Sequence, residues 1–97
     1  MTKLPPNQQC LIIQLIGLGE RYGLDLVRAS DGRLRRGGIY VTLDRMEDMG
    51  LVSSRQEQPG EVIDRAQAYT GIPRRLYKLT ERGLRVRAAL ALLAEAP

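Results

Sequence analysis

The sequence has 97 residues, 43% of them hydrophobic, which is enough for one compact domain and too little for two. It contains no His and one Cys, so imidazole acid–base catalysis, Cys-rich zinc sites and an intramolecular disulfide are excluded. Fifteen Lys and Arg residues against eleven Asp and Glu residues give a formal net charge of +4. We therefore expect one slightly basic domain that is not an enzyme and binds no cofactor or metal ion.

The sequence also carries no signal for a membrane. Its apolar stretches are far shorter than the roughly 20 residues that span a bilayer. The first ten residues lack the apolar run of a signal peptide. We expect a cytoplasmic protein without membrane contacts.

The first third of the chain predicts two helices. Residues 8–18 concentrate six Leu and Ile side chains in two or three turns, so the first helix is apolar almost all round. Residues 21–29 place Leu and Val at the spacing of a short second helix. Asp31 and Gly32 then predict a turn.

A third helix, predicted over residues 36–49, has the clearest pattern. Ile39, Leu43 and Met46 lie at i, i+4 and i+7, so one stripe faces the core, and Gly50 ends the helix. The opposite face includes Val41, Asp44, Arg45 and Asp48.

Two glycines near the predicted start of this helix are unusual. Gly37 and Gly38 lower helix stability there, by about 1 kcal/mol against Ala at an interior position. They either allow another backbone to come very close or simply make the start of the helix flexible. Both interpretations remain open at this point.

The second half of the chain predicts a hairpin and a last helix. Residues 51–57 and 74–79 read as antiparallel strands, separated by a long tip, 58–73, that contains two Pro and two Gly. A short helical turn over 62–69 is compatible with that tip. The last helix, 80–94, places Val86, Leu90 and Leu93 at i, i+4 and i+7.

This order of elements is that of a winged helix-turn-helix. The fold class is mainly α with a small antiparallel β-hairpin: three helices, a two-stranded wing and a C-terminal helix. We expect residues 8–79 to form a DNA-binding core and residues 80–95 to form a helix at a dimer interface. In this fold the third helix enters the major groove, and its positive N-terminal end attracts phosphate.

Three segments resemble the PadR-like family of transcriptional regulators. GGIYVTLDRMEDMGLV is similar to the recognition helix and first wing strand of that family. RRLYKLTERG resembles its second wing strand and last helix, and RYGLDL its Tyr-Gly opening of the second helix. The resemblance covers about residues 8–90 and implies a homodimer that binds double-stranded operator DNA, usually as a repressor.

Two features depart from the family pattern. Arg35 and Arg36 stand where many members have a Ser-Pro pair. The chain has no Trp or Phe and one predicted C-terminal helix, whereas ligand-responsive members often hold planar effectors against aromatic side chains. This composition argues against a small-molecule effector.

Two basic tracts without an acidic residue, GRLRRGG and RRLYK, contribute most of the predicted DNA contacts. With the third helix they make up the following set: Arg35, Arg36, Gly37, Gly38, Tyr40, Val41, Arg45, Arg74, Arg75 and Lys78. Arg45 either contacts DNA or pairs with Asp48. Tyr40 either reaches a phosphate while its ring packs against the wing, or is purely structural.

The first and last helices carry more apolar surface than one small core can bury, which predicts a homodimer. The predicted interface contains Leu11, Ile12, Leu15, Val86, Leu90 and Leu93. A different function remains open, that of a winged helix that binds protein without DNA. The basic tracts favour DNA, whereas Asp44 and Asp48 on the outward face would repel phosphate.

Overall fold

The computed structural model describes residues 5–58 and 74–95. Along the chain its elements are α1 (Asn7–Ile16), β1 (Arg21–Tyr22), α2 (Gly23–Ala29), α3 (Ile39–Asp48), β2 (Val52–Gln56), β3 (Arg75–Leu79) and α4 (Glu81–Glu95). The predicted winged helix-turn-helix is confirmed. Most of the predicted hairpin tip, including the helical turn over 62–69, lies outside the described residues.

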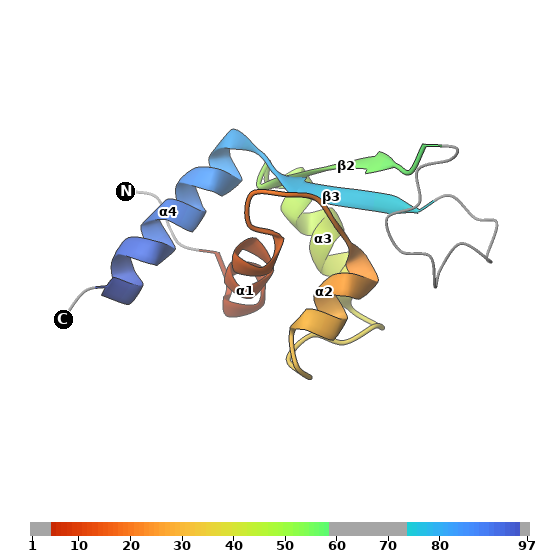
Figure 1. Ribbon diagram of the computed structural model, residues 1–97, viewed down its shortest axis with the longest axis horizontal. Helices are drawn as coiled ribbons and strands as arrows, with labels where there is room; N and C mark the ends of the chain where they lie inside the picture. Colours follow the sequence, from red (N-terminus) through yellow and green to blue (C-terminus); the bar gives the residue numbers. More distant parts are fainter. Residues whose placement is uncertain (1–4, 59–73, 96–97) are drawn as a thin grey trace.

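The core lies between the first three helices and the inner face of the sheet (Figure 1). Leu26, Leu43 and Met46 are completely buried, each from a position that the apolar spacing of α2 or α3 predicts. The full cluster is Ile12, Ile13, Ile16, Leu26, Leu34, Ile39, Leu43, Met46, Leu51, Val52, Tyr77 and Leu79. The apolar stripe of α3 therefore faces inward, and its polar face is left for solvent or a partner.

The sheet has three strands rather than the two that the sequence predicts. Their order is β1-β3-β2, and all neighbours are antiparallel. Arg21 and Tyr22, which we expected in the second helix, pair with Tyr77 and Leu76 of β3. Tyr22 is buried in this position, so the start of the segment gains more from pairing with the sheet than from another half-turn of helix.

Two helix boundaries also differ from the prediction. α3 begins at Ile39 rather than at residue 36, because the amides of Gly38 and Ile39 both donate to the Arg35 carbonyl and form a turn there. Gly is a poor helix former, which favours that turn over an extra turn of helix. α1 ends at Ile16, since Gly17 adopts φ +61°, and Leu18 beyond it is 81% exposed.

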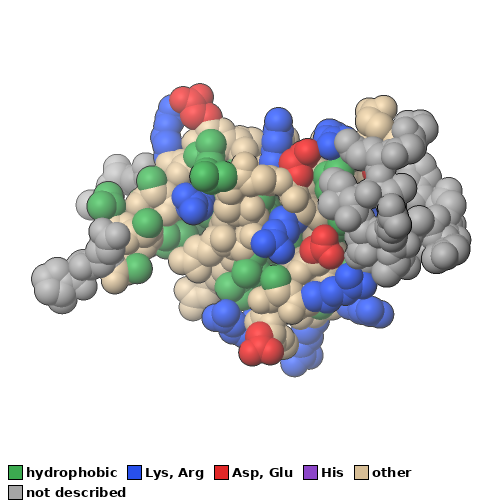
Figure 2. Space-filling model, in the orientation of Figure 1, with side chains coloured by type: hydrophobic (Ala, Val, Ile, Leu, Met, Phe, Trp, Pro, Cys, Tyr) green, Lys and Arg blue, Asp and Glu red, His purple; other side chains and the backbone are tan. Residues whose placement is uncertain are grey.

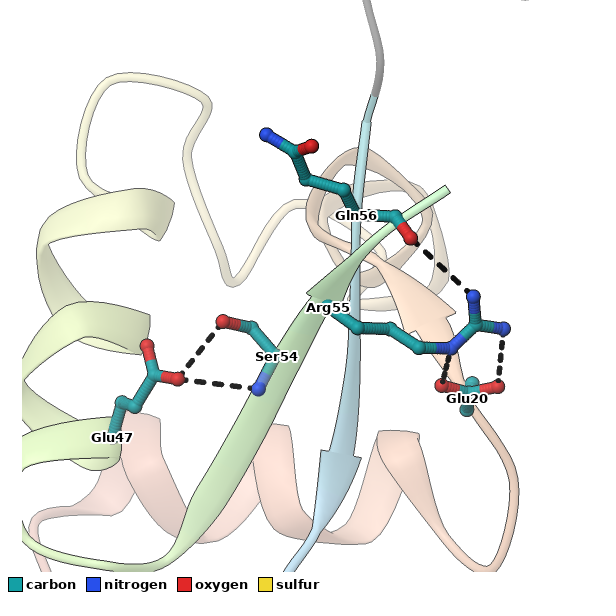
Figure 3. Close-up of polar contacts among 5 residues, drawn as sticks. All are labelled: Glu20, Glu47, Ser54, Arg55 and Gln56. Atoms are coloured by element: carbon teal, nitrogen blue, oxygen red, sulfur yellow. Dashed lines mark hydrogen bonds and ion pairs between the residues drawn. The ribbon is translucent and has the colours of Figure 1, made fainter. Parts of the chain in front are cut away.

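An ion pair connects the two outer parts of the sheet. Arg55 of β2 donates from Nε to Glu20 Oε2 at 2.8 Å and from Nη2 to Glu20 Oε1 at 2.9 Å (Figure 3). Arg55, Leu76 and Tyr22 form one row across the three strands, and Leu76 in the middle is buried. This bidentate ion pair therefore links the residue just before β1 to β2, the strand on the other side of β3.

Candidate nucleic-acid interface

The turn that leads into α3 is built around one buried serine. Ser30 Oγ donates to the Val27 carbonyl at 2.7 Å and accepts from the Leu34 amide at 2.9 Å. Leu34 anchors the far side of the turn in the core, and Asp31 and Gly32 have φ +54° and +87°. The predicted turn at Asp31 and Gly32 is confirmed, but sequence reasoning missed Ser30 and Leu34.

This turn presents two arginines at the start of α3. Arg35 and Arg36 are both exposed, and no side chain in the described part of the chain pairs with either of them. A Cβ added to Gly37 or Gly38 would meet nothing within 4 Å. Both predicted features of the site, two consecutive arginines and an unobstructed glycine backbone, therefore lie side by side on the surface.

The backbone at the start of α3 carries unused hydrogen-bond donors. Gly38 is the N-cap residue, and no side chain caps the helix. The Ile39 amide donates to the Arg35 carbonyl and the Thr42 amide to the Gly38 carbonyl. For the two amides between them, no acceptor is found among the described residues. Two N–H groups and the positive end of the helix dipole therefore point toward the arginine turn.

A groove of about 280 Å³ lies beside the same end of α3. Arg35 and both glycines line it. Its lining consists of Gln8, Leu34, Arg35, Gly37, Gly38, Ile39 and Thr42. The groove gives a partner access to the start of α3 from the side of α1.

The outward face of α3 carries charges of both signs. Val41 is 54% exposed, and Asp44, Arg45 and Asp48 are exposed beside it. Of the two interpretations of Arg45, pairing with Asp48 receives no support, since no ion pair joins them in the structure. Arg45 is therefore available to a partner, and the acidic side chains gather in the second half of the helix.

Tyr40 contacts the start of α2, a neighbour that the sequence did not indicate, and it also lies near enough to Tyr77 of β3 to raise the pKa of that phenol. A Cβ on Gly23 would lie 2.8 Å from Cε1 of Tyr40, so Gly23 leaves the space that the ring occupies. Tyr40 is 46% exposed. Tyr40 therefore combines a structural contact with a side chain that stays partly exposed.

The wing is attached to α3 by a carboxylate. Glu47 Oε2 accepts from the Ser54 amide at 3.2 Å and from Ser54 Oγ at 2.8 Å (Figure 3). Behind this contact, burial raises the pKa of Tyr77 above its usual value, and the carboxylates of Asp44 and Glu47 raise it further while Arg75 opposes them. Asp44, Glu47 and Arg75 thus lie around one buried phenol at the junction of α3 and wing.

The basic residues of the second tract, RRLYK, lie on different faces of the sheet. Arg75 and Lys78 are both exposed, but they are three positions apart in β3 and so point to opposite faces. Arg75 shares its face with Tyr77 and hence with α3, whereas Lys78 lies opposite Ser53 on the outer face. The three basic residues of RRLYK therefore do not form one patch, and Arg75 is the one on the side of α3.

The predicted dimer surface lies on α4 and α1, away from the wing (Figure 1). Figure 2 shows apolar side chains along α4. Leu92 is 70% and Leu93 is 58% exposed, whereas Leu11, Leu15, Val86 and Leu90 are partly buried against the core. Ile12 is completely buried within its own chain and offers no surface to a partner.

Comparison with known proteins identifies the family. The model of the transcriptional regulator PadR-like family matches residues 12–89. The chain belongs to this family. A search of curated proteins gave no match to this PadR-like sequence.

Several solved structures share the fold of this PadR-like chain. The structure of Bacillus subtilis PadR in complex with operator DNA superposes with a TM-score of 0.72 at 20% identity, covering 96% of this chain and 50% of that one. A PadR-like transcription factor from Bacteroides fragilis gives 0.69 at 21% identity, covering 91% and 80%. A PadR family regulator from Clostridium difficile R20291 gives 0.67 at 23% identity, covering 87% and 82%. The chain therefore spans about half the length of the Bacillus subtilis protein.

The described part of this PadR-like chain holds neither a metal cluster nor a membrane span. In residues 5–58 and 74–95, no three His, Cys, Asp or Glu side chains are grouped so that they could hold a metal ion. Over the same residues, none of the helices has the length and apolar composition that crossing a membrane requires. The single cysteine, Cys10, donates from Sγ to the Pro5 carbonyl at 3.2 Å, and burial raises the pKa of its thiol.

Proposed function

We propose that this chain is a DNA-binding repressor that acts as a homodimer on an inverted-repeat operator. The observation that carries the proposal is the start of α3, where Arg35 and Arg36 are exposed beside two open glycines and two unused amides. Arginine and helix N-terminal amides both bind phosphate, and arginine also reads guanine bidentately. Membership of a family of transcriptional regulators supports the same conclusion.

The open backbone explains why DNA, rather than a free anion, fits this end of the helix. A phosphate group of a duplex approaches as part of a stiff chain and needs room beside the amides that bind it. Gly37 and Gly38 leave that room, because no described atom outside each glycine and its two chain neighbours lies within 4 Å of where the Cβ atom would be. We assign Arg36 to a guanine edge and Arg35 to the neighbouring phosphate.

The wing and the rest of α3 supply the remaining contacts in this proposal. Arg75 lies on the α3 side of β3, so it reaches a flanking phosphate while α3 occupies the major groove. Val41 and Arg45 extend the reading surface along the helix. Arg74, Lys78 and Tyr40 complete the proposed set.

The homodimer is supported by the apolar surface of α4. Leu84, Leu92 and Leu93 are exposed, which costs about 25 cal/mol for each Å² of apolar area left in water. A shallow groove of about 130 Å³ between α1 and α4, lined by Gln14, Arg87, Leu90, Ala91 and Ala94, lies beside them. A second copy would cover this surface, with Leu11, Leu15, Val86 and Leu90 at its edge. We omit Ile12 because it is buried.

An electrophoretic mobility shift tests the proposal. The probe is the DNA that flanks the protein's own coding region, and the competitor is random DNA of equal length. A DNA-binding regulator should retain the probe against an excess of competitor. Equal competition by both DNAs would contradict sequence-specific binding.

One observation favours a second candidate, a winged helix that binds a protein. Asp44 and Asp48 are exposed on the outward face of α3, where they would repel phosphate. If this candidate holds, the affinity for DNA of any sequence should be negligible at physiological salt. Sedimentation of the protein with and without DNA separates the two candidates.

A further inference from the structure

The end of α3 is closed by a Schellman cap. The Leu51 amide donates to the Met46 carbonyl at 2.9 Å and the Gly50 amide to the Glu47 carbonyl at 3.0 Å, with Gly50 at φ +75°. The carbonyls of residues 49–51, which follow in the chain, have no partner inside α3. They must be satisfied elsewhere or by water.

All three of those carbonyls accept hydrogen bonds from the start of α4. Arg82 Nη1 donates to the Met49 carbonyl at 3.1 Å. Thr80 donates from Oγ1 to the Gly50 carbonyl at 2.5 Å and from its amide to the Leu51 carbonyl at 3.1 Å. Thr80 and Arg82, at the start of α4, therefore bond each of the three carbonyls of residues 49–51.

The two segments also touch backbone to backbone. A Cβ on Gly83 would lie 2.1 Å from the Leu51 carbonyl oxygen and 3.3 Å from Cβ of Leu79. The Gly83 amide donates to Thr80 Oγ1 at 3.1 Å, so Thr80 caps α4 while it holds Gly50. With no side chain between the backbones, α4 cannot tilt here without breaking hydrogen bonds.

We propose that Thr80, Arg82 and Gly83 form a rigid joint that fixes the angle between α4 and α3, and that Arg82 is a positioning residue for operator spacing. This inference rests on the proposed function, a dimer through α4 that places two α3 helices on DNA. α4 has 15 residues and is about 22 Å long. A tilt of about 10° at the joint would therefore move α3 by about 4 Å, close to the rise of about 3.4 Å for one base pair.

The test compares two exposed arginines of α4 that differ in their contacts. Arg82 bonds the Met49 carbonyl, whereas among the described residues Arg85 bonds only Glu81 of its own helix, at 2.9 Å. Arg82→Ala and Arg85→Ala each remove one positive charge, so their general effect on DNA attraction is the same. Both are made in the full chain. The DNA is the best operator selected from a random library by the wild-type protein.

The measurement is the affinity for operators whose half-sites are moved apart or together by one base pair, which rotates one half-site by about a tenth of a turn. The wild-type protein and Arg85→Ala should discriminate against both changes by roughly tenfold. Arg82→Ala should discriminate by less than about threefold, with unchanged affinity for an isolated half-site. Arg82→Lys keeps a donor and should recover part of the discrimination.

The outcomes separate this inference from the function on which it rests. If Arg82→Ala keeps the wild-type discrimination, or if Arg85→Ala loses as much, the joint does not set the spacing and the inference is wrong. If Arg82→Ala binds isolated half-sites poorly, the substitution has affected folding. The spacing discrimination of Arg82→Lys then tests the inference: recovery of part or all of the wild-type discrimination is expected if a donor at this position is enough, and none would contradict the joint. If the wild-type protein is a monomer or binds no operator, the proposed function itself fails.

Discussion

The two ends of α3 are built in opposite ways. The first end has no side-chain cap, two unused amides, two open glycines and two unpaired arginines within the described residues. The last end has a Schellman cap, and Thr80 and Arg82 bond the carbonyls of residues 49–51 that follow it. In addition, Glu47 in its last turn holds Ser54 of the wing.

Under the proposed function, this difference assigns DNA contacts to the first end of α3 and attachment of the wing and α4 to the last end. Polar groups at the first end remain for a partner, since leaving donors unsatisfied is costly unless water or a ligand meets them. Polar groups at the last end form hydrogen bonds within the chain, and these bonds hold the wing and α4 in place. A change at the first end should therefore alter affinity for a half-site with little effect on stability. A change at the last end should alter stability or the angle between α3 and α4, with little effect on affinity for an isolated half-site.

The largest expected effect is on stability, at the closed end. Gly83→Ala would drive a methyl group into the Leu51 carbonyl oxygen, which belongs to the backbone and cannot move aside cheaply. We expect a loss of about 3 kcal/mol or more in the free energy of unfolding. Urea unfolding followed by circular dichroism measures it. A loss of less than about 1 kcal/mol would show that α4 is not packed against Leu51 in this way.

The matched substitution at the open end is Gly37→Ala. No atom lies within 4 Å of the new methyl group, so the free energy of unfolding should stay the same or rise by up to about 1 kcal/mol. Affinity for the operator should fall, because the methyl group enters the space that a phosphate needs. Fluorescence anisotropy measures the affinity. Unchanged binding would favour the interpretation of these glycines as a merely flexible turn.

The wing provides a smaller, sequence-independent effect. If each subunit makes about four phosphate contacts, log K for the dimer should fall with log salt at a slope of about −7. Arg75→Ala removes two contacts per dimer, so the slope should become shallower by about 2 and affinity should drop on all sequences alike. Titration at several salt concentrations measures both. The contact is absent if the slope does not change.

The smallest effect concerns pH at the junction of α3 and wing. Because the pKa of Tyr77 is raised in the folded chain, ionisation is easier after unfolding, and stability falls as pH rises from about 10 through the folded pKa. Tyr77→Phe should lose less stability over that interval. Urea unfolding of both proteins at pH 9 and above supplies the comparison. Parallel pH profiles would indicate that Tyr77 titrates as it does when unfolded.

The sequence predicted much of the fold because its strongest signals are local. Ile39, Leu43 and Met46 mark the buried stripe of α3, and Thr80 marks the start of α4, as the structure confirms. The strand at Arg21 and Tyr22 was missed because its pairing with β3 is decided by residues more than fifty positions away. Short strands of this kind carry no periodicity of their own.

The candidate site was predictable in composition but not in arrangement. Arg35, Arg36 and the two glycines stand out in the sequence as an acid-free tract. That Arg75 and Lys78 lie on opposite faces, and that Ile12 is buried, depends on the register of β3 and on the packing of α1. The contacts of Arg82 with Met49 and of Tyr40 with Gly23 join distant segments, so no local pattern could reveal them.

The central claim is that the open end of α3 reads DNA. The most direct test compares Arg36→Ala with Arg85→Ala. Both remove one positive charge, but Arg36 has no partner among the described residues, whereas Arg85 pairs with Glu81. On every single-base variant of the selected operator, Arg85→Ala should keep the wild-type preferences. Arg36→Ala should lose about 1–3 kcal/mol of discrimination at one position in each half-site. Equal preference profiles for the two variants would contradict base reading by Arg36 and leave it among the phosphate contacts.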